Sequence, residues 1–179
     1  LACPAVCTIH ITQTQSSLGA RAGRLRDVVA ESAIRTAPLP LTAVSDRRAI
    51  ELGGFSGQRI HTVYNGVPAP PEDRLERWRT ARRKELGWSD DTLGFLAVGR
   101  MVDQKRPLRF LELAEEIHRI HPAAKFAWIG DGELAGEWDR RAGGKADWIC
   151  RLPWQTDTRP WFAAADVFLH TAAFEGLPL

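Results

Sequence analysis

The fold is decided by residues 93–129, which read LGFLAVGRMVDQKRPLRFLELAEEIHRIHPAAKFAWI. An apolar run, Leu93–Val98, is followed by a polar loop and then by apolar residues at helical spacing after Pro107. A second apolar run, Ala124–Ile129, closes the segment. A strand, a helix and a second strand in this order indicate a parallel sheet with a helix packed on its face.

Apolar runs and helical spacing alternate in the same way through the rest of the 179 residues. The further strands that we expect cover Ala5–Ile11, Leu39–Val44, Arg59–Tyr64, Trp148–Leu152 and Asp166–Thr171. The further helices that we expect cover residues 22–36, a short stretch from Ser45 to Gly53-Gly54, and residues 72–86, 133–141 and 158–164. The pattern predicts an α/β protein built from parallel sheets with helices on their faces.

The composition excludes several classes of protein. Lys and Arg number 24 and Asp and Glu number 22, so the net charge of +2 gives no sign of a nucleic-acid partner. No apolar run approaches the roughly 18 residues that span a bilayer. We expect Cys3, Cys7 and Cys150 to be buried free thiols of a reducing compartment. A cytoplasmic location is therefore expected, with peripheral contact at the inner face of the membrane left open.

A stiff proline-rich spacer, Pro68-Ala69-Pro70-Pro71, marks a change in composition and predicts a domain boundary. We expect one domain over residues 1–67, a hinge and linker helix over residues 68–91, and a second domain over residues 92–179.

The expected linker helix is rich in cations. These are Arg74, Arg77, Arg79, Arg82, Arg83 and Lys84. One interpretation is a face that attracts phosphates or a membrane surface. The other, which we favour, is a solvated face whose positive charge is offset by acidic side chains of the same helix. Those acids are Glu72, Asp73, Glu76 and Glu85.

Ligands of an open parallel sheet bind beyond the carboxyl ends of its strands, so the loop after each strand is informative. The loop after Leu93–Val98 holds Arg100 and Lys105 ahead of a helix, which suits a diphosphate. The alternative is a pair of solvated surface cations. The next such loop holds Gly130-Asp131-Gly132, which indicates either close approach to a ligand or, as we favour, a tight turn.

Two more residues at strand ends are candidates for a site. Glu175 follows the last expected strand, where it could accept hydrogen bonds from sugar hydroxyls or cap a helix. His10 ends the first strand, where it could project into a site or lie buried against a backbone group. His170 is expected in the core, and His118 and His121 are expected to be structural residues near a helix end.

These motifs occur in an order that resembles a known family. The residues concerned are Val98-Gly99-Arg100 with Lys105, Ile129-Gly130-Asp131-Gly132-Glu133, Ala165-Asp166-Val167-Phe168-Leu169, Phe174-Glu175-Gly176-Leu177-Pro178-Leu179 and, upstream, Thr8-Ile9-His10, Val44-Ser45 and Val63-Tyr64-Asn65-Gly66-Val67. Together they resemble retaining GT-B glycosyltransferases of the family-4 type. The resemblance covers most of the chain and implies two Rossmann-like parallel-sheet halves, both incomplete here, with a cleft between them.

The resemblance also implies an activity. Such an enzyme moves a sugar from a nucleotide-sugar donor to an acceptor, retains the anomeric configuration and binds no metal. Arg100 and Lys105 would hold the donor diphosphate and stabilise the leaving nucleotide. The catalytic residues implied are His10, Arg100, Lys105 and Glu175. The donor-binding residues implied are Gly99, Arg100, Lys105, Gly132, Glu175, Gly176 and Leu177.

Cofactors and partners follow from the same residues. The sequence has no Asp-x-Asp pair and no spacing of His and Cys typical of metal ligands. We therefore expect no metal and no cofactor, with the nucleotide-sugar as a co-substrate. The expected partners are this donor and an acceptor that is a sugar, a lipid-linked sugar or a glycan, without nucleic acid.

The sequence departs from the family pattern at both ends. The second acid of the family's Glu-x7-Glu motif would fall past Leu179, and the opening strands and Gly-rich loop precede Leu1 in the family. We interpret the chain as an internal fragment that joins the end of one domain to the first half of the donor domain. Two alternatives remain open: a non-catalytic sugar-nucleotide-binding module, and another GT-B enzyme such as a nucleotide-sugar epimerase or a phosphorylase.

Overall fold

The computed structural model describes residues 6–10, 23–36, 39–145 and 147–175. The chain divides into two compact units. The first unit contains Leu1–Pro68 together with Glu175–Leu179, and the second contains Ala69–Phe174. Each unit has its own parallel sheet, and each is described below by itself.

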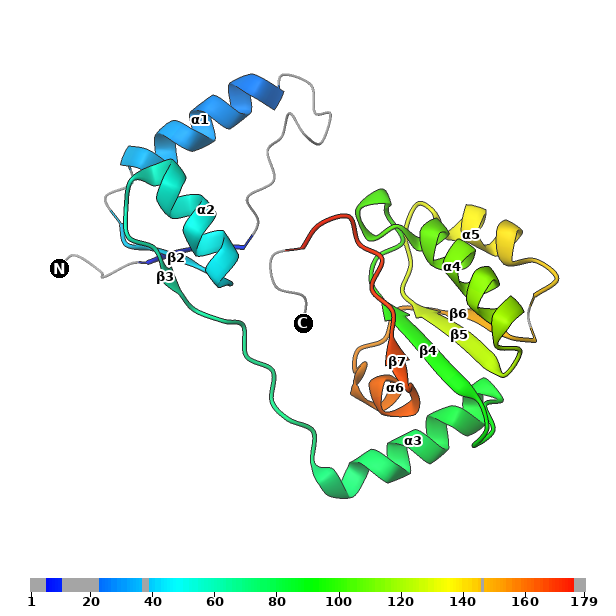
Figure 1. Ribbon diagram of the computed structural model, residues 1–179. Coiled ribbons are helices and arrows are strands. Elements are labelled where there is room, and N and C mark those ends of the chain that lie inside the picture. The colour runs from blue at the N-terminus through cyan, green and yellow to red at the C-terminus, as the bar shows by residue number, and fades with distance from the viewer. Residues whose placement is uncertain (1–5, 11–22, 37–38, 146, 176–179) are drawn as a thin grey trace. The chain divides into compact units, whose positions relative to one another are not determined.

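The first unit has a three-stranded parallel sheet in the order β1-β2-β3 (Figure 1). Its elements are β1 (Cys7–Ile9), α1 (Gly23–Thr36), β2 (Leu41–Ala43), α2 (Asp46–Ser56) and β3 (His61–Thr62). Helix α2 packs on β2 and β3, and α1 packs on α2. Between the strands, the hydroxyl groups of Thr8 and Thr42 are hydrogen-bonded at 2.8 Å.

Helix α2 begins where the sequence predicts and ends later. Ser45 is its N-cap residue, although its side chain makes no capping hydrogen bond within the described part of the chain. The prediction that Gly53-Gly54 ends the helix is wrong, because the helix continues to Ser56. Gly57 is the residue that takes a left-handed conformation, with a φ of 71°, and its N–H donates to the carbonyl of Gly53.

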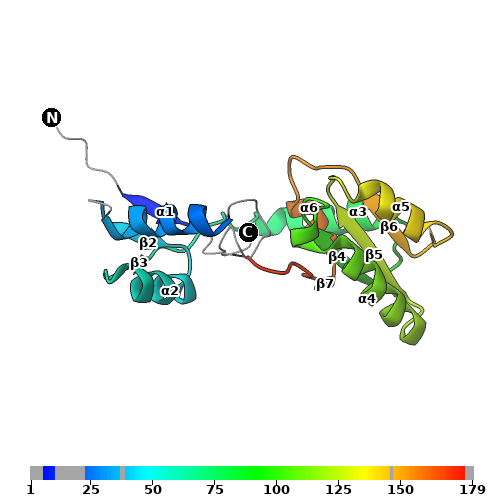
Figure 2. The same ribbon diagram turned by 90° about the horizontal axis from the view of Figure 1, so that it is seen from above.

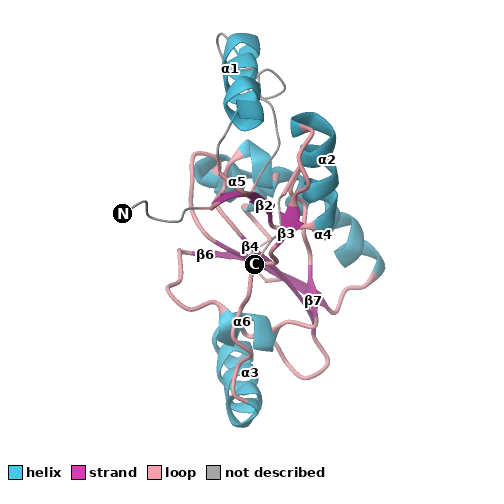
Figure 3. Cartoon of the chain, turned by 90° about the vertical axis from the view of Figure 1, so that its left-hand side faces the viewer, coloured by secondary structure: helices cyan, strands magenta, loops and turns pink. Residues whose placement is uncertain are grey.

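The second unit has a four-stranded parallel sheet in the order β6-β5-β4-β7, with helices on both faces (Figures 2 and 3). Its strands are β4 (Leu93–Val98), β5 (Ala124–Ile129), β6 (Ile149–Leu152) and β7 (Val167–Phe168). Its helices are α3 (Glu72–Leu86), the 3₁₀ turn η1 (Asp103–Lys105), α4 (Pro107–Ile120), α5 (Ala135–Ala142) and α6 (Arg159–Ala164). The two parallel sheets confirm the predicted fold class of Rossmann-like α/β halves.

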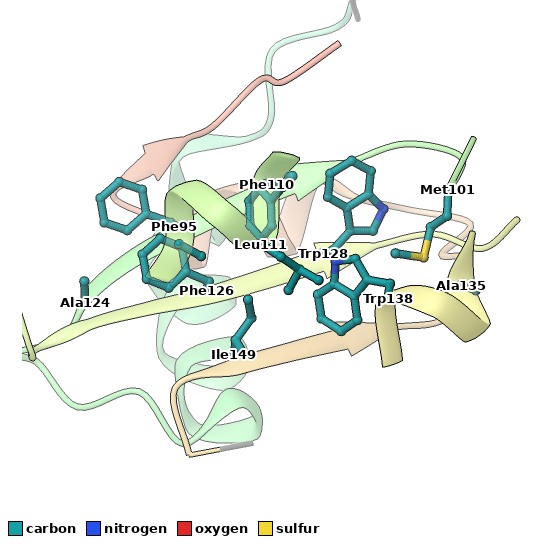
Figure 4. Close-up of a cluster of buried hydrophobic side chains, with 12 residues drawn as sticks. Phe95, Met101, Phe110, Leu111, Ala124, Phe126, Trp128, Ala135, Trp138 and Ile149 are labelled. Atoms are coloured by element: carbon teal, nitrogen blue, oxygen red, sulfur yellow. The ribbon is translucent and has the colours of Figure 1, made fainter. Parts of the chain in front are cut away.

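The sheet of the second unit is buried on both faces. On the face of α4 and α5, Phe95 stacks on Phe126 at 4.7 Å between ring centroids, and the edge of Phe110 meets Trp128 at 5.3 Å (Figure 4). On the opposite face, a smaller cluster surrounds the buried Trp161. Burial on both faces explains why β4 and β5 are nearly continuous apolar runs in the sequence.

Strand β7 is shorter than predicted. Only Val167 and Phe168 pair with β4, and the N–H of Leu169 makes the last hydrogen bond to that strand, with the carbonyl of Leu96 at 2.8 Å. Beyond this point the chain leaves the sheet and contacts the loop after β4. The hydroxyl of Thr171 donates a hydrogen bond to the carbonyl of Lys105 at 2.9 Å. The end of the predicted strand is therefore a loop.

Helix α3 has the predicted bounds, and Arg74 and Arg77 are exposed as expected, but two other arginines of the helix are not part of a solvated face. The helix packs on α6, with the guanidinium of Arg82 4.5 Å from the centre of the Trp161 ring. Arg83 is only 4% exposed. The favoured interpretation of a solvated, self-neutralised face is thus wrong for Arg83 and for Arg79, whose partners lie on other elements.

Arg79 and Arg83 meet at one carboxylate, that of Asp166 just before β7. Arg83 donates to Asp166 at 3.2 Å and to the carbonyl of Ala164 at 3.0 Å, and Arg79 donates to Asp166 at 2.6 Å. The same carboxylate accepts the N–H of Gly94 at 2.8 Å. Partial burial raises the pKa of Asp166, but the Gly94 amide and the two arginines outweigh it and hold the pKa below its ordinary value. The charge cluster therefore attaches α3 to the edge of the sheet.

The prediction of buried free thiols is confirmed in part. Cys7 and Cys150 are free thiols, as expected, but both are half-buried rather than fully buried. Burial raises the pKa of the Cys150 thiol to about 11, against the opposing effect of Lys125, so the thiol stays protonated at neutral pH. The remaining expected thiol, Cys3, lies outside the described residues.

Replacing Asp166 with Asn should lower the free energy of unfolding by about 3 kcal/mol at neutral pH, because Arg83 would keep its burial and lose its counter-charge. The folded-state pKa of Asp166 is lowered, so its contribution is present above the ordinary carboxyl pKa. It is lost as the pH falls through the folded-state value. Urea unfolding at several pH values should show the two proteins converging in acid.

The matched control is Asp157→Asn, which removes an exposed partner of Arg159. Its effect on unfolding should be small, because exposed ion pairs contribute little. An equal loss of unfolding free energy in Asp166→Asn and Asp157→Asn would show that the partly buried charge cluster stabilises the fold no more than an exposed ion pair does.

Candidate functional site

Two loops at the carboxyl edge of the second sheet are joined through their backbones. They follow β4 (residues 99–106) and β5 (residues 130–134). The N–H of Met101 donates to the carbonyl of Asp131 at 2.8 Å. In the other direction, the N–H of Leu134 donates to the carbonyl of Met101 at 2.9 Å. These reciprocal bonds fix the first candidate loop against the second.

Gly130 and Gly132 are required by this contact between the loops. Gly130 has a φ of 138°, and a Cβ there would lie 2.1 Å from the carbonyl oxygen of Gly99. Gly132 has a φ of 156°, and a Cβ there would lie 2.6 Å from the carbonyl oxygen of Met101. The favoured interpretation as a simple tight turn is therefore incomplete, because these glycines allow two loops to pack backbone to backbone.

A third loop, residues 169–174 after β7, is attached to the first. Besides the bond of Thr171 to Lys105, the N–H of Ala173 donates to the carbonyl of Gln104 at 2.8 Å. The amide side chain of Gln104 donates in turn to the carbonyl of Phe174 at 3.2 Å. The structure thus brings together the segments that follow β4, β5 and β7, at the edge where the sequence predicts a site.

The two predicted cations lie in different surroundings within the first loop. Arg100 is exposed, whereas Lys105 is half-buried in η1. A Cβ at Gly99 would be 3.4 Å from Cδ of Lys105, which shows that the lysine stem packs along the glycine backbone. Gly99 and Lys105 are therefore a packed pair, whereas Arg100 is an exposed cation of the loop, as is Arg106.

Glu175 is half-buried and belongs by its contacts to the first unit. Its backbone carbonyl accepts a hydrogen bond from Nη2 of Arg48 at 2.9 Å, and Nη1 of Arg48 pairs with Glu51 at 2.5 Å. The sequence reasoning missed Arg48. The available signal was a second arginine in the first turn of the helix that follows β2. Gly176 and Leu177, also predicted to bind the donor, lie outside the described residues.

The histidines separate into exposed and packed residues. His10 directly follows β1 and is exposed, so the alternative of a buried His10 is wrong. His170 is exposed too, with its ring 5.8 Å from Phe168, so its expected place in the core is also wrong. The reason is that β7 ends at Phe168, so His170 lies in the loop that follows the strand. His118 is structural as expected, because it stacks on Trp148 at 4.3 Å.

Arg151 at the end of β6 is a further charged residue that the sequence reasoning did not select. It donates to Asp139 of α5 at 2.6 Å and approaches Asp131 of the second loop at 3.8 Å. Its hydrogen bond to Asp139 lowers the pKa of that carboxyl. A lone charged residue within an otherwise apolar expected strand was the signal available in the sequence.

Groups of acidic, histidine and cysteine side chains that could hold a metal ion are absent from the described part of the chain. Within that same part, none of the helices is long and apolar enough to cross a membrane.

Replacing Gly132 with Ala should destabilise the protein by roughly 2–3 kcal/mol, because the new Cβ would collide with the Met101 backbone at a positive φ. The matched control is Gly136→Ala in α5, where the Cβ meets only ordinary contact at 3.8 Å. Gly136→Ala should raise the free energy of unfolding by up to about 1 kcal/mol, because alanine favours the helix more than glycine does. Chemical denaturation measures both, and a neutral Gly132→Ala would contradict the close approach of the loops.

Comparison with known proteins finds a matching family model and similar curated proteins. Residues 92–179, just under half of the chain, match the family model described as glycosyl transferases group 1. The chain is 33% identical over 134 residues to the UDP-Gal:alpha-D-GlcNAc-diphosphoundecaprenol alpha-1,3-galactosyltransferase of Escherichia coli, covering 68% of this chain and 33% of that protein. It is 30% identical over 131 residues to the Vi polysaccharide biosynthesis protein VipC/TviE of Salmonella typhi, covering 69% of this chain and 22% of that protein. The chain thus spans a third or less of the length of these two relatives.

Solved structures share the fold. WaaG, a glycosyltransferase involved in lipopolysaccharide biosynthesis, superposes with a TM-score of 0.70 at 18% identity, over 95% of this chain and 51% of that one. Anabaena Alr3699/HepE in complex with UDP and glucose superposes with a TM-score of 0.69 at 18% identity, over 94% of this chain and 46% of that one. The chain therefore shares the fold of these structures, and its residues 92–179 match the family model described as glycosyl transferases group 1.

Proposed function

We propose that this chain is part of a glycosyltransferase that moves a sugar from a nucleotide-sugar donor to an acceptor, with retention of configuration and without a bound metal. The observation that carries the proposal is the group of hydrogen-bonded loops at the carboxyl edge of the second sheet, which holds Arg100 and Lys105. This is the edge at which parallel sheets bind nucleotides.

The proposed chemistry depends on charge. When the bond between sugar and diphosphate breaks, negative charge develops on the leaving nucleoside diphosphate. Arg100 is free to form paired hydrogen bonds with phosphate oxygens, and the stem of Lys105 is already held against Gly99. A cation that is held in place before the reaction, as the stem of Lys105 is, needs no rearrangement as the charge develops and therefore lowers the barrier most. Arg100 and Lys105 supply the positive charge that a metal ion would otherwise bring.

Further roles belong to the same proposal and rest on the family resemblance. Glu175, with the backbone of Gly176 and Leu177, would contact hydroxyl groups of the donor sugar. His10 would lie near the transferred sugar, and its exposure after β1 is compatible with that role. Gly132 would line the donor site through the loop that it shapes. Retention of configuration likewise rests on the resemblance of the motifs.

The acceptor in this proposal is a sugar, a lipid-linked sugar or a glycan. The E. coli relative is named for UDP-Gal and for alpha-D-GlcNAc-diphosphoundecaprenol, in which the sugar is linked to a lipid. An acceptor of this kind would bring the protein into peripheral contact with a membrane. A non-catalytic binding module, or an epimerase, would bind the same donor without transferring its sugar to a second molecule.

Arg100→Ala and Lys105→Ala should each lower kcat of the full-length protein on the order of 10²–10³-fold, by the loss of a group that stabilises charge in the transition state. The measurement is sugar transfer with a panel of nucleotide-sugars, followed by nucleotide release. Arg109→Ala is the matched control, since Arg109 is an exposed cation of α4 paired with Glu112. Near-normal sugar transfer by both Arg100→Ala and Lys105→Ala would show that these residues do not stabilise the diphosphate.

Metal independence is tested separately. Transfer should continue at an unchanged rate after exhaustive treatment with EDTA, because the loop cations supply the neutralising charge. If EDTA abolishes transfer and Mg²⁺ or Mn²⁺ restores it, that part of the proposal is wrong, while the assignment as a glycosyltransferase would stand.

A further inference from the structure

The backbone on either side of Lys105 is held by the loop after β7, which is drawn in red in Figure 1. Three successive carbonyl groups, those of Gln104, Lys105 and Arg106, accept hydrogen bonds from this loop. The N–H of Ala173 donates to the carbonyl of Gln104 at 2.8 Å. The hydroxyl of Thr171 lies 2.9 Å from the carbonyl of Lys105 and 3.2 Å from that of Arg106, so the two carbonyls share its one hydrogen. Thr171 is therefore the residue whose side chain joins the two loops at Lys105.

The residue that follows Lys105 has a strained backbone. Within the described ranges, Arg106 is the one residue other than glycine with a positive φ, at 50°. This left-handed conformation costs free energy for a residue with a Cβ, and it persists only where surrounding contacts hold it. The N–H of Arg106 donates to the carbonyl of Asp103 at 3.1 Å, and its carbonyl accepts the N–H of Phe110 at 3.2 Å. The Thr171 hydroxyl adds a contact from the third loop, so it helps to hold the turn that fixes the Lys105 backbone.

The side chain of Lys105 begins in a confined space. Its stem lies against the backbone of Gly99, and with Thr171 and His170 it lines a cavity of about 10 Å³. A cavity of that size holds no more than about one water molecule. A backbone shift at Lys105 is therefore passed along the packed stem to the ammonium group. Misplacing a catalytic group by about 1 Å can cost on the order of 10²-fold in rate.

We propose that Thr171 is a positioning residue for Lys105, and that its hydroxyl keeps the lysine where negative charge develops on the leaving nucleoside diphosphate. The inference rests on the proposed function and adds to it a residue outside the loop that carries the cations. Thr171 also lies four residues before Glu175, the residue proposed to contact the donor sugar. The segment that leads to the sugar contact thus also sets the cation that faces the leaving group.

The test is a double-mutant cycle of Thr171→Val and Lys105→Ala in the full-length protein. The readouts are kcat and KM for the donor that the panel of nucleotide-sugars selects. Thr171→Val keeps the branched shape of threonine and removes the hydroxyl. Alone, it should lower kcat roughly 10- to 100-fold by misplacing Lys105. KM should change little, because the charge that Lys105 stabilises develops only in the transition state.

Two further variants separate positioning from a merely structural role. In the Lys105→Ala protein, Thr171→Val should cause no further loss of kcat, because no ammonium group is left to misplace. Thr171→Ser, which keeps the hydroxyl, should recover most of the rate. Thr171→Ala also lacks the hydroxyl, and it takes the place of Thr171→Val in the cycle if the valine variant does not fold.

Thr80→Val is the matched control, because Thr80 is an exposed threonine of α3 outside the joined loops. It should transfer sugar as the unchanged protein does. An unchanged kcat in Thr171→Val would overturn the positioning role and leave the proposed function standing. Equal losses from Thr171→Val with and without the Lys105 side chain would also overturn it, since Thr171 would then act independently of the lysine. If the unchanged protein transfers sugar from none of the nucleotide-sugars, the proposed function fails together with this inference.

Discussion

The carbonyl of Gly99 occupies the space in which any other residue at position 130 would place its Cβ. This contact, with the similar one between Met101 and Gly132, lets the loops after β4 and β5 pack without side chains between them. The loop after β7 then attaches to η1 through Thr171 and Gln104. The position of Arg100 and Lys105 depends on this assembly, because both lie in the loop that the other two hold.

The fold was largely predictable because its helices and strands follow simple periodicities. The bounds of α3, β4 and β5 agree with the sequence to the residue. The errors lie where a tertiary contact overrides a local signal. Gly57 ends α2 in place of the Gly53-Gly54 pair, because Gly57 is the residue that takes the left-handed conformation. Arg79 and Arg83 look solvated in sequence because their partner, Asp166, lies far along the chain.

The location of the candidate site was predictable from one rule, that parallel sheets bind ligands at their carboxyl edge. What the sequence could not show is how the site is built. Nothing local to Gly130 reveals that its neighbour is the carbonyl of Gly99. Likewise, the apolar run before His170 predicts a strand that includes it, and only the contacts of the following loop show that the strand ends at Phe168. Arg48 was missed for the same reason, since its partner Glu175 is 127 residues away.

The joined loops after β4 and β5 are proposed to form a nucleotide site. Hydrogen–deuterium exchange of the chain with and without UDP tests this proposal directly. The backbone amides of these loops should exchange more slowly when a bound nucleotide covers them. UDP should add protection in residues 99–106 and 130–134 and leave exchange unchanged in α1 and in the interior of α4. Protection that UDP induces elsewhere, with both loops unaffected, would contradict it.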